Sequence, residues 1–107
     1  RFEFTGSWTN FDDPAVTQPL IWTPVEDINA TAGFQNNPTG IQIVMRVADA
    51  CSRPANTWWI WLGGFTDAGW DITVRDVETG IQRTYIRQPD SGNFPVTMRD
   101  ATTFLCN

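Results

Sequence analysis

Histidine and lysine are absent from this sequence of 107 residues, and cysteine occurs only twice. Without histidine the chain lacks the usual general base, so Ser-His and Cys-His nucleophile pairs are excluded. Without lysine it cannot form the Schiff bases of amine catalysis. A zinc site with four cysteine or histidine ligands is excluded because the chain has two cysteines and no histidine. A pair of carboxylates, as in glycoside cleavage, is the one catalytic arrangement that these residue types still permit.

Twelve acidic residues could supply such a pair, and the adjacent candidates are Asp12-Asp13, Glu26-Asp27 and Asp76 with Glu78. A glycosidase needs a cleft, and a β domain of this length offers little depth for one. Calcium is the metal that acidic side chains suit best, through Asp12-Asp13 or through Asp67 with Asp71. Aspartate in turns ordinarily binds the backbone instead. We therefore expect neither an enzyme nor a bound metal or other cofactor.

Positive charge is scarce, since all seven cations are arginine and the net charge is −5. Arginines scattered along the sequence form no obvious basic patch, so we expect neither nucleic acid nor an anionic membrane surface as a partner. No apolar run approaches the ~20 residues that a membrane helix needs. The chain starts directly in a strand-like segment at Arg1, and we interpret it as a mature or excised fragment.

Apolar residues alternate with polar ones and do not recur at helical spacing. Ile41 to Ala48 alternates in this way, and Trp70 to Arg75 is followed by a turn in which Gly80 suits a positive φ. Six to eight such strands predict a single antiparallel β-sandwich over residues 1–107, Ig-like or jelly-roll-like, with a barrel as the alternative. Residues 1–40 alternate less clearly, and we expect an irregular segment or an edge that pairs with a partner.

Cys51 and Cys106 are the only cysteines, and an even count in a small chain rich in tryptophan suits an oxidising compartment. We expect a disulfide between them that closes the sandwich and holds the C-terminal end. The alternative is two buried free thiols in a cytosolic protein. With the bridge, the protein is expected to be secreted and extracellular.

Several segments carry a family resemblance, namely Val44 to Cys51, Trp59 to Asp67, Ile72 to Gly80, Thr84-Tyr85, Phe94 to Val96 and Asp100 to Cys106. In their order and spacing these segments resemble an uncharacterised β domain that recurs, often C-terminally, in secreted multidomain proteins of environmental bacteria. The resemblance implies an extracellular bacterial domain with a Cys51–Cys106 bridge. It also implies structural aromatic side chains near Trp59 and Trp61, and it implies no activity.

Six tryptophans in 107 residues are a high count. Flat indole rings stack on the apolar faces of sugars, but large aromatic side chains also dominate small cores. In an extended strand Trp59 and Trp61 share one face and Trp58 lies on the other. Following the resemblance, we expect Trp59 and Trp61 to be buried and Trp58 to be exposed. The candidate ligand- or partner-binding residues are Trp58, Trp8, Trp22 and Trp70.

Two functions fit these features. The first is a non-catalytic module that binds polysaccharide or a cell-surface glycan through exposed aromatic side chains. The alternative is a structural subunit that assembles with copies of itself into an extracellular filament or coat by adding its N-terminal strand to a neighbouring sheet. In that case Phe2 and Phe4 would fill pockets on the next copy. The tryptophan count favours the first function, and the strand-like N-terminal segment favours the second.

Overall fold

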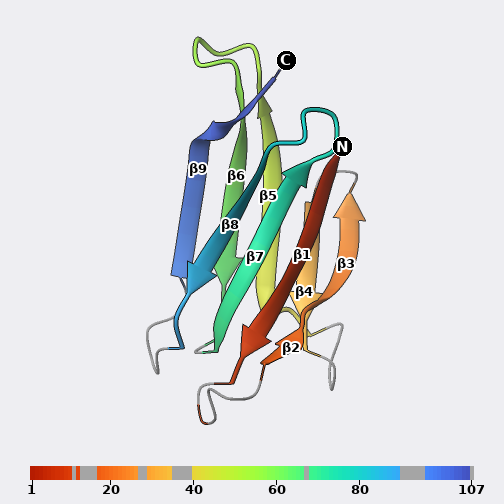
Figure 1. The fold of residues 1–107 in the computed structure, drawn as a ribbon, viewed down its shortest axis with the longest axis vertical. Helices are drawn as coiled ribbons and strands as arrows, with labels where there is room; N and C mark the ends of the chain where they lie inside the picture. The colour runs from red at the N-terminus through yellow and green to blue at the C-terminus, as the bar shows by residue number, and fades with distance from the viewer. Residues whose placement is uncertain are drawn as a thin grey trace.

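The computed structural model describes residues 1–10, 12, 17–26, 29–34, 40–66, 68–89 and 96–106. These residues form nine β-strands, arranged in two antiparallel sheets that pack face to face (Figure 1). The prediction of an antiparallel β-sandwich is therefore confirmed. Within these ranges no helix has the length and apolar character needed to cross a membrane.

The two sheets contain four and five strands. The first sheet has the order β2 (Thr17–Pro19), β1 (Phe2–Thr9), β7 (Gly69–Asp76) and β8 (Gln82–Arg87). The second has the order β3 (Ile21–Glu26), β4 (Asn29–Gly33), β5 (Ile43–Ala50), β6 (Thr57–Gly64) and β9 (Val96–Leu105). The strands run along the long axis of a body that measures 44 × 23 × 20 Å. Both sheets therefore present long outer faces, and in the five-stranded sheet β6 lies between β5 and β9.

The core lies between the sheets and is built by alternation along the central strands. Because successive side chains of a strand point to opposite faces, every second residue of β5 and β7 enters the core. The buried apolar side chains that alternate along these two strands are Ile43, Met45, Val47, Trp70, Ile72 and Val74. Phe104 of β9 is completely buried among them. The central core thus follows the alternation along these strands.

The N-terminal segment belongs to its own sandwich. β1 lies between β2 and β7 and pairs with β7 over all eight of its residues. The ring of Phe2 packs edge-on against Trp58 with 5.3 Å between centroids, and Phe4 packs against Trp22 at 5.6 Å. The described part of residues 1–40 is not irregular but forms four strands, two of which, β2 and β3, lie at sheet edges. Phe2 and Phe4 fill the core of their own domain and not pockets on a neighbouring copy.

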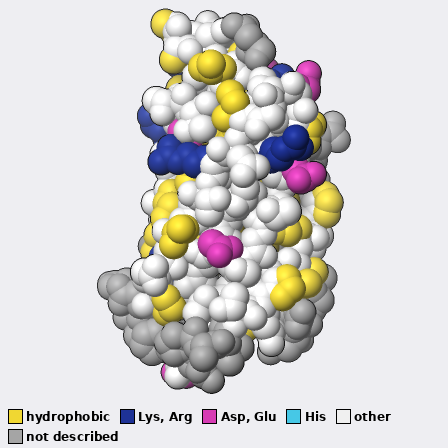
Figure 2. All heavy atoms as spheres, in the orientation of Figure 1, with side chains coloured by type: hydrophobic (Ala, Val, Ile, Leu, Met, Phe, Trp, Pro, Cys, Tyr) yellow, Lys and Arg dark blue, Asp and Glu magenta, His cyan; other side chains and the backbone are white. Residues whose placement is uncertain are grey.

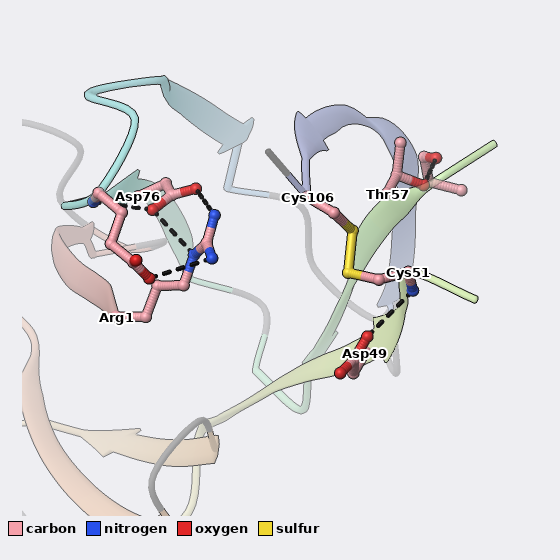
Figure 3. The surroundings of a disulfide bond; sticks show 8 residues. Arg1, Asp49, Cys51, Thr57, Asp76 and Cys106 are labelled. Atoms are coloured by element: carbon pink, nitrogen blue, oxygen red, sulfur yellow. Dashed lines mark hydrogen bonds and ion pairs between the residues drawn. A yellow bond between two sulfur atoms is a disulfide. The ribbon is translucent and has the colours of Figure 1, made fainter. Parts of the chain in front are cut away.

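The disulfide between Cys51 and Cys106 is confirmed, with a distance of 5.8 Å between the two Cα atoms. It joins the loop after β5 to the end of β9 (Figure 3). The Cys51 backbone N–H also donates a hydrogen bond to the Asp49 carboxylate at 3.0 Å. The bridge closes the same end of the sandwich at which β1 begins. A small disulfide-bonded β domain of this kind is compatible with an extracellular location.

Candidate functional site

β6 carries apolar side chains on both faces, and the structure determines which face enters the core. Ile60 and Leu62 are buried between the sheets, and Trp58 packs against the same core. Trp59 and Trp61 lie on the outer face, where Trp61 is 39% exposed and Trp59 is half-buried. The prediction that Trp61 is buried and Trp58 exposed is therefore wrong.

Pairing with β5 explains this orientation. Residues directly opposite one another in a sheet lie on the same face. Met45 of β5 lies opposite Leu62 of β6. Because Met45 faces the core, Leu62 and the residues of β6 on the same side also face the core. Arg46, the next residue of β5, lies opposite Trp61. Because burial of an unpaired arginine is costly, Arg46 faces outward and Trp61 shares its face.

The four tryptophans expected to meet a ligand belong to the core. Trp70 is only 2% exposed, and Trp8, Trp22 and Trp58 are partly buried against the core cluster. Trp8 also stacks on Phe34 with 4.2 Å between ring centroids. The indole nitrogens of all four are buried and have no hydrogen-bond partner within the described ranges. The surface aromatic groups are different residues.

A shallow groove of about 320 Å³ runs over the outer face of the five-stranded sheet. Its lining residues come from β5, β6 and β9 and from the segment after β6, and they are Val44, Arg46, Trp61, Leu62, Gly63, Phe65, Thr97 and Met98. Gly63 lies between Val44 and Thr97 in the strand register. A Cβ atom on Gly63 would come no closer than 3.9 Å to Phe65. The floor of the groove is therefore open because Gly63 has no side chain.

Arginines surround the two outer tryptophans. The guanidinium carbon of Arg99 lies 5.1 Å from the ring centroid of Trp59 and 5.4 Å from that of Trp61. The guanidinium carbon of Arg53 lies 5.2 Å from the Trp59 centroid. Arg46 and Arg99 stand opposite Trp61 on the two neighbouring strands. We call the surface formed by Arg46, Arg53, Trp59, Trp61 and Arg99 the Trp-Arg face.

Sequence reasoning missed the Trp-Arg face because its arginines are far apart along the chain. Positions 46, 53 and 99 look scattered, and the sequence was expected to form no basic patch. The strand order β5-β6-β9 brings Arg46 and Arg99 to the two sides of Trp61, and the loop between β5 and β6 brings Arg53 to Trp59. The available signal was the alternation of Arg46 with buried apolar residues of β5, which places that arginine on the outer face.

The outer face of the other sheet is different. Figure 2 shows separate charged and separate hydrophobic side chains on this side, surrounded by backbone and other side chains. Thr5, Thr73 and Thr84 lie opposite one another on β1, β7 and β8. The hydroxyls of Thr73 and Thr84 are 2.7 Å apart. Among the described residues, exposed tryptophan combined with arginine is found on the outer face of the five-stranded sheet.

The acidic candidates for catalysis have structural contacts where they are described. The Asp76 side chain is fully buried and accepts two hydrogen bonds from Arg1, at 2.8 and 3.1 Å (Figure 3). Burial alone would raise the pKa of Asp76, but hydrogen bonds from Arg1, the Glu78 backbone and Thr79, with the charge of Arg1, hold the pKa below its ordinary value. Glu78 pairs with the same Arg1 at 3.0 Å. Both acids therefore anchor the N-terminal residue.

The remaining acidic candidates form no metal site in the described part of the chain. Asp71 accepts hydrogen bonds from the backbone and hydroxyl of Ser7. Asp12 is exposed, and Asp13, Asp27, Asp67 and the Glu26 side chain lie outside the described residues. Across the described ranges no three acidic or cysteine side chains are grouped so that they could hold a metal ion.

A buried carboxylate joins the two sheets on the side of β8 and β9. Asp100 accepts hydrogen bonds from the Tyr85 hydroxyl at 2.7 Å and from Arg83 at 3.1 Å. Burial alone would raise the pKa of Asp100, but hydrogen bonds from Thr103, Tyr85 and the Thr102 backbone lower it to about 2. Asp100 therefore remains ionised at neutral pH as a link between the sheets.

Comparison of the chain with family models, with curated proteins and with solved structures finds no match. The Trp-Arg face and its groove are therefore the observations on which a function can be based.

Proposed function

We propose that this domain is a non-catalytic extracellular module that binds polysaccharide through the groove and the Trp-Arg face. The observation that carries the proposal is Trp61, a large ring 39% exposed beside a groove that is open at Gly63. An indole ring offers a flat apolar surface for the C–H face of a sugar. Val44 and Phe65, both exposed, provide apolar walls for a sugar stacked there.

The position of Trp61 on a central strand supports a binding role. The inner side of β6 is fixed in the core by Ile60 and Leu62, and β5 and β9 pair with it on both sides. A ring held in this way loses little conformational freedom when a ligand arrives. The open groove also suits a polymer, because a chain of sugars can pass over it at any point along its length.

The buried acids give catalysis no comparable support. Asp76 is bound to Arg1, and Asp100 is bound to Tyr85 and Arg83. Neither of them lines the groove. The alternative function, assembly by exchange of the N-terminal strand, gains no support either, because β1 is paired on both sides within its own sheet.

Affinity electrophoresis against soluble neutral and acidic polysaccharides tests the proposal. We expect at least one polymer to retard the protein, and Trp61→Ala and Gly63→Val to abolish that retardation. Gly63→Val fills the groove at a position where the structure leaves room for a side chain. The matched control is Ile86→Ala, which removes a 61% exposed apolar side chain from the other sheet. Retardation by no polymer, or retardation that both groove variants leave unchanged, would contradict the proposal.

A further inference from the structure

Six of the seven arginines fall into two groups according to their contacts, and the seventh, Arg75 of β7, lies on the other sheet and forms no ion pair within the described ranges. Arg1 and Arg83 pair with carboxylates, and Arg87 donates hydrogen bonds to the carbonyls of Thr66 and Ala68. In contrast, the three arginines of the Trp-Arg face form no ion pair with any carboxylate within the described ranges. The chain as a whole has a net charge of −5. A local group of unpaired positive charges on such a protein favours an anionic ligand.

From this arrangement we infer that the Trp-Arg face binds a polyuronate, an acidic polysaccharide whose sugar units carry carboxylates. The inference rests on the proposed function, because it uses Trp61 as the surface on which a sugar ring stacks. It adds the class of polysaccharide and assigns a role to Arg46 and Arg99.

The strand register places charge where a uronate would need it. Arg46 and Arg99 lie opposite Trp61 on its two neighbouring strands, at the ~4.8 Å spacing of paired strands. The carboxylate of a uronic acid projects from the edge of the sugar ring. A ring stacked flat on Trp61 therefore directs its carboxylate sideways, toward one of these two guanidinium groups.

Stacking on tryptophan prepares arginine for this contact. The guanidinium group is planar, and its N–H donors point outward in that plane. The Arg99 guanidinium lies over the rings of Trp59 and Trp61 and forms no hydrogen bond with a described residue, so its N–H donors are available to a ligand. A guanidinium group matches a carboxylate through two parallel hydrogen bonds. Contact with the two rings also restricts the Arg99 side chain before the ligand binds, which lowers the entropy lost on binding.

Calorimetric titration with polygalacturonate, with the same polymer reduced at its carboxyl groups, and with dextran sulfate tests the inference. We expect tight binding of polygalacturonate only, weakened by high salt. Arg46→Gln and Arg99→Gln should each weaken it by about tenfold, the effect of losing one partly exposed charged hydrogen bond. If Arg99→Gln also displaces the tryptophan rings, its effect on affinity does not isolate the lost charge. The Arg46→Gln variant then decides the test, because Arg46 does not lie over either ring. The control Arg75→Gln removes the same charge from the other sheet and should leave affinity unchanged.

The outcomes separate the inference from the proposed function. If the reduced polymer binds as tightly as polygalacturonate and Arg46→Gln has no effect, while Trp61→Ala still abolishes binding, the uronate inference is overturned and the binding function stands. Tighter binding of dextran sulfate than of polygalacturonate also overturns it, because the face then selects sulfate or charge density. If Trp61→Ala binds polygalacturonate like the parent protein, the proposed function fails together with the inference.

Discussion

Alanine substitution of Trp58 and of Trp61, one at a time, should separate stability from binding on a single strand. Trp58 packs edge-on against Phe2, lies under the Arg1 guanidinium at 5.2 Å, and has a buried indole nitrogen. Its removal leaves a cavity between the sheets. Replacement of a large core aromatic residue by alanine costs about 3–5 kcal/mol. We expect Trp58→Ala to lose stability in this range.

Trp61→Ala should be much less destabilising. The ring is partly exposed, so its removal opens no internal cavity. What is lost is an edge-on contact with Trp59 at 6.5 Å and the contact with Arg99. An aromatic pair contributes about 0.5–1.5 kcal/mol and an exposed cation–π contact about 0.5–1 kcal/mol. Together these give a loss of about 1–2.5 kcal/mol.

Urea denaturation followed by tryptophan fluorescence measures both free energies of unfolding, and affinity electrophoresis measures binding. The difference of about 2–3 kcal/mol corresponds to a gap of roughly 10–20 °C in melting temperature for a domain of this size. We expect folded Trp58→Ala protein to retain binding and Trp61→Ala protein to lose it. Equal destabilisation by the two substitutions, or loss of binding in folded Trp58→Ala alone, would refute the assignment of the two faces.

Three further substitutions test the contacts that hold the sandwich. Replacing Cys51 and Cys106 by alanine should cost about 4 kcal/mol for a bridge that spans 55 residues, and an unmoved urea midpoint would contradict this. Asp100, with a folded pKa of about 2 against 3.8 unfolded, should stabilise the fold by about 2 kcal/mol above pH ~4, a contribution lost as pH falls through ~2. Tyr85→Phe removes one hydrogen bond to Asp100 and should reduce this acid dependence of unfolding free energy, measured by urea titration at several pH values. Asp76→Asn breaks a buried ion pair and should cost about 3 kcal/mol in the same titration, whereas an effect below about 1 kcal/mol would mean that Arg1 is dispensable.

Much of the fold could be predicted from the sequence because its signals are local. The alternation from Trp70 onward and the turn at Gly80 predicted the hairpin formed by β7 and β8, and Gly80 has a φ of 77°. Alternation from Ile41 onward predicted β5 in the same way. Each of these signals depends on residues close together in the chain, where strand pairing needs only a tight turn.

The binding surface could not be predicted in this way because it depends on long-range pairing. The sequence of β6 is apolar on both faces, so alternation alone cannot assign one of them to the core. Arg46 settles the assignment only when β5 is known to pair with β6 in this register. Arg99 joins the same surface only because β9 pairs on the other side. The resemblance to secreted bacterial domains pointed to Trp61 as structural, and the register places it at the surface.

A strand that is apolar on both faces is typical of one that is covered on both sides. In this sandwich the core covers the inner face of β6, and Arg53 and Arg99 cover part of Trp59. Trp61 is the more exposed of the two outer rings and borders the open groove at Gly63. The part of the outer face of β6 that no side chain covers is therefore at Trp61 and the groove beside it. A ligand should gain most of its apolar contact there, with Trp59 holding Arg99 in position beside it.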